Sequence, residues 1–301
     1  MTWRLLVSAV AAAAALFGVA SADKNDERTA AALRPYDIIA KAPADAWRPL
    51  DLENTLLMDL PQGEVVIELR PDFAPKHVEQ IKTLVRQGFY NGLHFHRVIE
   101  GFMAQGGDPK ADGTGASSLP DIPAEFTRDT KETPNFVQIG RDRIASRVGF
   151  IDGMPVAAQP ESLRSFKTDR EVVVWGVHCP GVMSMARATN PNSANSQFFL
   201  MIGDSRLNLD RRYTVWGWIV DGFENTRRIA RGEPPARPTP IIRVRVAADV
   251  PDEDKPKVQV MRTDSPAFKE YIEAAGYVKD GFVRNMCAIK PPRKVGEQIE
   301  I

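Results

Sequence analysis

Two apolar segments near residue 60 have a pattern that predicts a β-hairpin. NTLLMDL (54–60) and EVVIELR (64–70) flank the turn Pro61-Gln62-Gly63. Short runs rich in Val, Ile and Leu on either side of a glycine-containing turn are typical of paired antiparallel strands.

The next segment, APKHVEQIKTLVRQGFY (74–90), has a different period. Its apolar residues Val78, Ile81, Leu84 and Val85 recur at helical spacing, and Pro75 stands where the first turn of a helix tolerates proline. This pattern predicts an amphipathic helix that covers one side of a sheet or barrel.

Short β-rich segments dominate the rest of the chain. Because they are many, helices are few and there is no βαβ alternation, we expect a mainly antiparallel β-structure, closed or sandwiched. Near the C-terminus, DSPAFKEYIEAAG (264–276) predicts a short helix with Ser265 as N-cap and Gly276 as its end. The β-rich segments are LHFHRVI (93–99), GFMAQGG (101–107), GVMSMARA (181–188), SQFFLMI (196–202) and YTVWGWIV (213–220).

The N-terminal residues are those of a secretory signal peptide. Arg4 precedes an apolar stretch from Leu5 to Ala20, and small residues up to Ala22 lead into a charged turn. We expect cleavage after Ala22 and a periplasmic or secreted protein that is not held in the membrane. The alternative is an uncleaved anchor, but this stretch is shorter than the ~20 residues needed to span a bilayer.

The remaining sequence divides into three expected regions. We expect an extended lead-in over 23–50, a main domain over 51–249 and a C-terminal extension over 250–301. Residues 111–179 are the least interpretable part and are read as an insertion. The chain contains 39 basic and 39 acidic residues, so a nucleic-acid partner is not expected, because phosphate binding needs concentrated Lys and Arg.

Two cysteines, Cys179 and Cys287, are the only ones in the sequence. In an oxidising compartment a single disulfide is the natural expectation. Two unpaired buried thiols remain the alternative.

The stretch FHRVIEGFMAQGGDP (95–109) carries the candidate chemistry. Side chains alternate between the two faces of a strand, which would place Phe95, Arg97 and Ile99 on one face and His94, His96 and Val98 on the other. A surface that combines one cation with amides and apolar residues is poor for hydrolysis or redox work. It suits the binding of an extended peptide, whereas a core strand with one paired arginine is the alternative.

The longer motifs resemble the cyclophilin family of peptidyl-prolyl cis-trans isomerases. The resemblance covers roughly residues 51–110 and 180–232, and several long blocks stand in the family's order. It implies an eight-stranded antiparallel β-barrel capped by helices, with the proline site on its outer surface. The blocks are FHRVIEGFMAQGGDP with GTG at 113–115, GVMSMARA, NSANSQFFLMI and LDRRYTVWGWIVDGFE.

By this resemblance Arg97 is the catalytic arginine, and a set of residues forms the substrate groove. The expected activity needs no cofactor or metal, because rotation about an X-Pro bond requires no reacting group. The expected partners are proline-containing unfolded or extended polypeptides, and we expect a monomer. The resemblance places Phe102, Met103, Phe199 and Leu209 in the proline pocket, and Gln105, Ala186, Gln197 and Tyr213 along the groove.

Three positions depart from the family pattern. Tyr213 stands where many members have histidine, Arg187 replaces a common asparagine, and Asn208 is nearest to the position of a frequent tryptophan. Two other functions remain open. One is a proline-peptide binding module or chaperone with little catalysis. The other is a metal site built from His94, His96 and the His178-Cys179 pair, since His-x-His places two imidazoles on one face of a strand.

Overall fold

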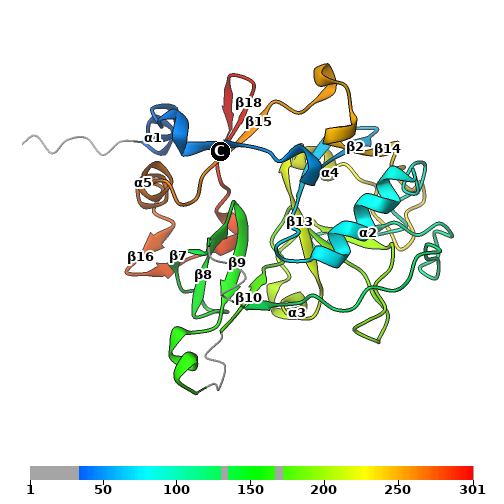
Figure 1. Ribbon diagram of the computed structural model, residues 1–301, viewed down its shortest axis with the longest axis horizontal. Coiled ribbons are helices and arrows are strands. Elements are labelled where there is room, and N and C mark those ends of the chain that lie inside the picture. The colour runs from blue at the N-terminus through cyan, green and yellow to red at the C-terminus, as the bar shows by residue number, and fades with distance from the viewer. Residues whose placement is uncertain (1–33, 130–134, 167–171, 301) are drawn as a thin grey trace, which may run out of the picture. The chain divides into compact units, whose positions relative to one another are not determined.

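The computed structural model describes residues 34–129, 135–166 and 172–300. Its centre is an eight-stranded antiparallel sheet, shown with the helices around it in Figure 1. Isolated bridges pair His94 with Pro240 and Val98 with Gly232, so one edge strand and the residues before it meet the segment that precedes the other edge strand, and the sheet curls into a barrel. In order across the sheet, the strands are β14 (Arg243–Val246), β2 (Thr55–Leu60), β3 (Gly63–Leu69), β13 (Val215–Asp221), β11 (Val182–Met185), β12 (Phe198–Met201), β5 (Met103–Gly106) and β4 (Arg97–Ile99).

The predicted hairpin and helix are confirmed. Leu60 pairs with Gly63 across the two-residue turn between β2 and β3. Helix α2 (Pro75–Arg86) begins at Pro75, and its predicted apolar residues are all buried. They pack in the same core cluster as the barrel interior, so α2 covers the barrel as expected.

Most of the barrel strands are buried on both faces. In β12, Phe198 and Leu200 point into the barrel core, whereas Phe199 and Met201 belong to a second apolar cluster outside it. This outer cluster also contains Val148 of the segment 111–179. In such strands, alternate side chains pack into two different cores, which explains why these segments are nearly continuous apolar runs in the sequence.

The segment read as an insertion forms a sheet of its own. Its five antiparallel strands pack against the barrel through the outer cluster. We call it the inserted sheet. Its strands, in spatial order, are β6 (Arg128–Asp129), β10 (Val173–Gly176), β9 (Met154–Ala158), β8 (Arg147–Ile151) and β7 (Val137–Gly140), and the short helix η3 (Glu161–Phe166) lies between β9 and β10.

The expectation that the lead-in over residues 23–50 is extended is wrong for the part that the structure describes. Residues 35–49 contain α1 (Pro35–Ala40) and β1 (Trp47–Pro49). Strand β1 pairs with β15 (Val258–Met261), so Trp47 lies opposite Met261. A three-residue strand that ends in proline carries too weak a local pattern to be predicted, and its partner lies more than 200 residues later in the chain.

The C-terminal extension supplies the other strands of the sheet that contains β1. Helix α5 (Pro266–Ala274) begins as predicted, with the Ser265 hydroxyl accepting a hydrogen bond from the Phe268 amide at 3.2 Å. Cys179 and Cys287 form a disulfide, so the expected pairing is confirmed. The remaining elements here are β18 (Arg293–Val295) and β19 (Gln298–Glu300) beside β15, the hairpin of β16 (Val278–Lys279) and β17 (Phe282–Val283), and the short helices η4 (Ala247–Asp249), η5 (Asp252–Asp254) and η6 (Met286–Ala288).

Candidate functional site

Three neighbouring strands bring the candidate residues to one face. Arg97 of β4 lies opposite Gln105 of β5. Phe199 of β12 lies opposite Gln105 on its other side. Because directly opposed residues point to the same face of a sheet, one row crosses the strands from a cation through an amide to an aromatic ring.

This row opens into a pocket of about 170 Å³. The helix α3 (Arg206–Leu209) and the loop after it supply the far wall. The pocket contains all but one of the residues expected from the sequence, and Arg187 joins them. The lining residues are Arg97, Phe102, Met103, Gln105, Ala186, Arg187, Phe199, Leu209 and Tyr213.

The floor of the pocket is apolar. Met103, Phe199 and Leu209 are buried members of the outer cluster, and Phe102 packs against them. The rings of Phe199 and Tyr213 meet edge to face with centroids 5.6 Å apart, which is a favoured geometry for aromatic pairs. The pocket can therefore take a small apolar ring while its rim stays polar.

Arg97 is held at the rim by a partner that the sequence did not indicate. Its Nε donates to Glu233 Oε2 at 2.7 Å, and the two side chains are 41% and 51% exposed. Arg97 carries further N–H donors on its two Nη groups, and among the described residues neither Nη group donates a hydrogen bond. No periodic or motif signal marks Glu233, which lies 136 residues after Arg97 in a loop.

Gln197 lies in an adjoining hollow of about 240 Å³. Gln105 Nε2 donates to Gln197 Oε1 at 2.9 Å. Gln197 Nε2 in turn donates to the carbonyl oxygens of Gly113 and Gly115. The two hollows share Gln105, Ala186 and Arg187, so together they form an elongated groove.

The expected strand faces need one correction. Phe95 lies in the barrel core together with Val98, not on the face of Arg97. Strand β4 begins only at Arg97, and the Phe95 amide donates to Thr239 O at 3.1 Å instead of continuing the ladder. The strict alternation of a strand therefore does not extend back to Phe95.

Beneath the pocket lies a set of side chains that resembles a hydrolytic triad. His178 Nδ1 is 3.0 Å from Asp210 Oδ1, and His178 Nε2 is 3.0 Å from Ser184 Oγ. Ser184 is fully buried, and its hydroxyl donates to Thr214 O at 2.9 Å. A nucleophile must reach its substrate, so this set cannot act as one. It supports the pocket instead, because the His178 ring stacks on Phe199 with centroids 6.1 Å apart.

Two residues of the alternative metal site, His178 and Cys179, are engaged by other groups. His178 is engaged by Asp210 and Ser184, and Cys179 is in the disulfide. His96 is buried beside Arg97, and burial lowers the pKa of its imidazole below the usual value. Within the described residues, no three His, Cys, Asp or Glu side chains gather closely enough to hold a metal ion.

Two of the three departures from the family pattern line the pocket. Arg187 and Tyr213 both line the pocket. Asn208 is exposed on α3 and does not line it. Tyr213 therefore takes part in the pocket wall directly, whereas Asn208 does not.

The comparisons with known proteins agree with this geometry. The model of the family "Cyclophilin type peptidyl-prolyl cis-trans isomerase/CLD" matches residues 55–248. A protein of Brucella suis described as a probable peptidyl-prolyl cis-trans isomerase is 38% identical over 215 residues, which cover 66% of this chain and 85% of the relative. A Bos taurus protein described as peptidyl-prolyl cis-trans isomerase-like 1 is 26% identical over 213 residues, or 71% of this chain and 99% of the relative.

A solved structure gives the same result. The crystal structure of cyclophilin AquaCyp293 from Hirschia baltica superimposes with a TM-score of 0.71 and 37% sequence identity, and the match covers 81% of this chain and 91% of that chain. The likeness thus extends beyond the segment that the family model matches. With its curled eight-stranded sheet and its match over residues 55–248, the chain belongs to the cyclophilin-type peptidyl-prolyl cis-trans isomerases.

Proposed function

We propose that this isomerase acts on X-Pro bonds in extended segments of exported polypeptides, with the proline ring in the pocket and the guanidinium of Arg97 beside the proline nitrogen. The observation that carries the proposal is the pocket of about 170 Å³, in which Arg97 stands at the rim beside an apolar floor. Burial in this hollow suits a five-membered ring, and the rim suits the bond that rotates.

The chemistry follows from the electronic structure of the amide. Resonance gives the C–N bond partial double-bond character and a rotation barrier of ~18–20 kcal/mol. In the twisted state this conjugation is lost, and the proline nitrogen becomes a better hydrogen-bond acceptor. An Arg97 Nη donor would therefore bind the twisted state more strongly than either planar isomer, which is the requirement for catalysis. Selective stabilisation of about 7 kcal/mol would accelerate rotation on the order of 10⁵-fold.

The rest of the groove would hold the chain on both sides of the bond. Phe102, Met103, Phe199 and Leu209 would fix the ring, so that the preceding carbonyl moves while the proline stays in place. Gln105 and Ala186, shared by the two hollows, would contact the backbone before the proline. Gln197 would act through Gln105, because its own amide group is bonded to the loop at Gly113 and Gly115.

Two features support action on exported proteins. The pattern of residues 1–22 is that of a cleaved signal peptide, although these residues lie outside the part of the chain that the structure describes. The disulfide between Cys179 and Cys287 is typical of oxidising compartments. Among the described residues, no helix has the length and apolarity needed to cross a bilayer. We propose a periplasmic or secreted monomer that assists the folding of newly exported chains.

The activity is tested by measuring cis-trans exchange of an Ala-Pro-containing peptide with NMR. We expect strong acceleration by the wild type and a loss of about 100-fold or more in kcat/KM for Arg97→Ala, as for other groups that stabilise a transition state directly. Arg97→Lys keeps the charge but loses the fork, so it should recover little activity. Peptide binding without acceleration by the wild type would support the binding-module alternative instead.

Export is tested separately. The full chain, expressed in a Gram-negative bacterium, should appear in the periplasm with Asp23 as its first residue. A full-length cytoplasmic product would contradict the location while leaving the activity untouched. Folding assistance is measured by adding the purified protein to a refolding protein whose slow phase is proline-limited, with Arg97→Ala as the control.

A further inference from the structure

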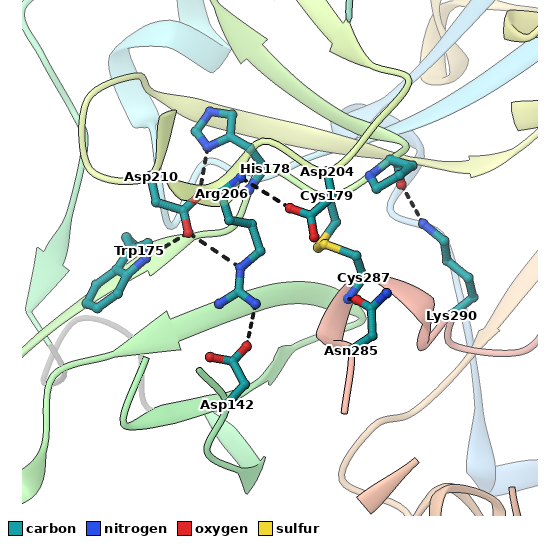
Figure 2. Close-up of a disulfide and its surroundings, with 11 residues drawn as sticks. Asp142, Trp175, His178, Cys179, Asp204, Arg206, Asp210, Asn285, Cys287 and Lys290 are labelled. Atoms are coloured by element: carbon teal, nitrogen blue, oxygen red, sulfur yellow. Dashed lines mark hydrogen bonds and ion pairs between the residues drawn. A yellow bond between two sulfur atoms is a disulfide. The ribbon is translucent and has the colours of Figure 1, made fainter. Parts of the chain in front are cut away.

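We infer that the inserted sheet braces the back of the proline pocket through Asp142, a positioning residue that holds Arg206 at the base of α3. The inference rests on the proposed use of the pocket and assigns a task to the segment 111–179. Figure 2 shows the side chains that carry it, with Arg206 between Asp142 and Asp210.

The short helix α3 links the pocket to the inserted sheet. Leu209, at its end, lines the pocket. Arg206, at its start, points away from solvent, is only 3% exposed and forms an ion pair with Asp142. Asp142 follows β7 in the inserted sheet, and its side chain is 6% exposed. One turn of helix thus carries a pocket residue at one end and a buried anchor at the other.

The carboxylate of Asp142 is oriented before it meets Arg206. Its Oδ1 accepts hydrogen bonds from the backbone amides of Ile144 at 2.9 Å and Ala145 at 2.7 Å. Its Oδ2 is left for the guanidinium of Arg206. An acceptor that is fixed by its own loop specifies where the arginine lies, and therefore where α3 begins.

A second path from the inserted sheet ends at the aromatic wall of the pocket. Arg206 Nε lies 3.6 Å from Asp210 Oδ2, and Trp175 of β10 donates to the same oxygen at 3.4 Å. Asp210 Oδ1 holds His178, whose ring stacks on Phe199. Asp142 and Trp175 both belong to the inserted sheet, and neither lines the pocket.

Loss of Asp142 would remove the main ionic partner of Arg206 and so weaken the position of α3. Arg206 Nε and Nη2 already lack a hydrogen-bond partner in their buried position. Without Asp142 the guanidinium would be left with Asp210 alone, and a buried charge without adequate pairing moves toward other acceptors or water. A helix of one turn has little stability of its own, so α3 should shift and carry Leu209 with it.

The test uses Asp142→Asn, which keeps the shape and removes the charge. We expect kcat/KM for an Ala-Pro peptide to fall about tenfold at a temperature well below unfolding, since misplacement of a positioning group by ~1 Å can cost up to 100-fold. KM should rise more than kcat falls, because the pocket wall holds the ring in the planar and the twisted state alike. The methyl NMR signals of Leu209 should also move. Trp175→Phe removes one long hydrogen bond and should have a smaller effect of the same kind.

Asp152→Asn is the matched control. Asp152 also lies in the inserted sheet and pairs with a barrel arginine, Arg70, at 3.1 Å, but it lines no part of the pocket. Its φ of 47° is one that asparagine tolerates. This variant should lose stability while its kcat/KM and its Leu209 signals stay as in the wild type.

Several outcomes decide the inference. If Asp142→Asn lowers Tm but leaves kcat/KM within twofold and the Leu209 methyls unmoved, the role is structural only and the inference is overturned. If Asp142→Asn does not fold, Asp142→Asn combined with Arg206→Met removes both charges. This double variant should fold and remain impaired, and full activity in it would also overturn the inference. An inactive wild type would refute the proposed function, while the Leu209 signals would still test the brace.

Discussion

The guanidinium of Arg187 lies over the ring of Tyr213, with its central carbon 4.6 Å from the ring centroid. Both residues line the pocket that also contains Arg97, and both depart from the common family pattern. Arg187 also donates two hydrogen bonds to Arg212 O, at 2.9 and 3.1 Å. The two departures are therefore coupled, because the arginine clamps the phenol ring that replaces the usual imidazole.

Removing this clamp should loosen the wall of the pocket. A cation–π contact at a partly exposed site contributes about 0.5–1 kcal/mol, so Arg187→Gln should lower kcat/KM about two- to fivefold. Arg212→Gln removes a cation from the same loop without losing a contact to Tyr213, and its activity should be unchanged. An equal loss in both variants would indicate that net charge, not the position of the ring, controls the rate.

Glu233 should affect catalysis through the orientation of Arg97. Exposed ion pairs contribute about 0.2–1 kcal/mol, so Glu233→Gln should reduce kcat/KM at most about fivefold, and the loss should be greatest at low salt. The control is Glu100→Gln. It removes the carboxylate that follows β4 and pairs with Arg231. If Glu233→Gln were faster than the wild type, Glu233 would compete with the substrate for Arg97 instead of orienting it.

The disulfide should contribute strongly to stability. It joins positions 108 residues apart, and a closed loop of about that length restricts the unfolded chain enough for a contribution of roughly 2–5 kcal/mol. Replacing both Cys179 and Cys287 with serine should lower the free energy of unfolding in guanidinium by that amount. A reducing agent should bring the wild type to the level of the variant and leave the variant unaffected. A wild type that is insensitive to reduction would contradict the prediction.

His96 should make the fold sensitive to mild acid. Burial lowers the pKa of its imidazole below that of the unfolded chain, which is ~6.5. In the window between these two pKa values the unfolded state binds a proton that the folded state does not, so the free energy of unfolding falls as the pH drops through it. In His96→Gln the decrease between pH 7 and 5 should be smaller, as measured by urea unfolding at each pH. Equal slopes would show that His96 titrates normally when folded.

Local patterns in the sequence were enough to predict the elements whose partners are close along the chain. The hairpin of β2 and β3, the helix beginning at Pro75 and the helix capped by Ser265 depend on neighbouring residues alone, so their periods and caps predicted them. The resemblance in the motifs named the pocket residues, and eight of the nine named positions line one hollow. Gln197 is the exception, since it reaches the pocket only through Gln105.

Tertiary structure decided the features that depend on distant segments. No local pattern could indicate that Trp47 pairs with Met261, that Arg97 meets Glu233, or that Asp142 supports Arg206. These contacts form only when segments far apart in the sequence pack together. The sequence by itself therefore determined the fold family and which residues line the pocket, because short-range periodicity and motif residues carry both. The contacts around the groove, Asp142 with Arg206 and Arg97 with Glu233, join residues that are 64 and 136 positions apart in the chain.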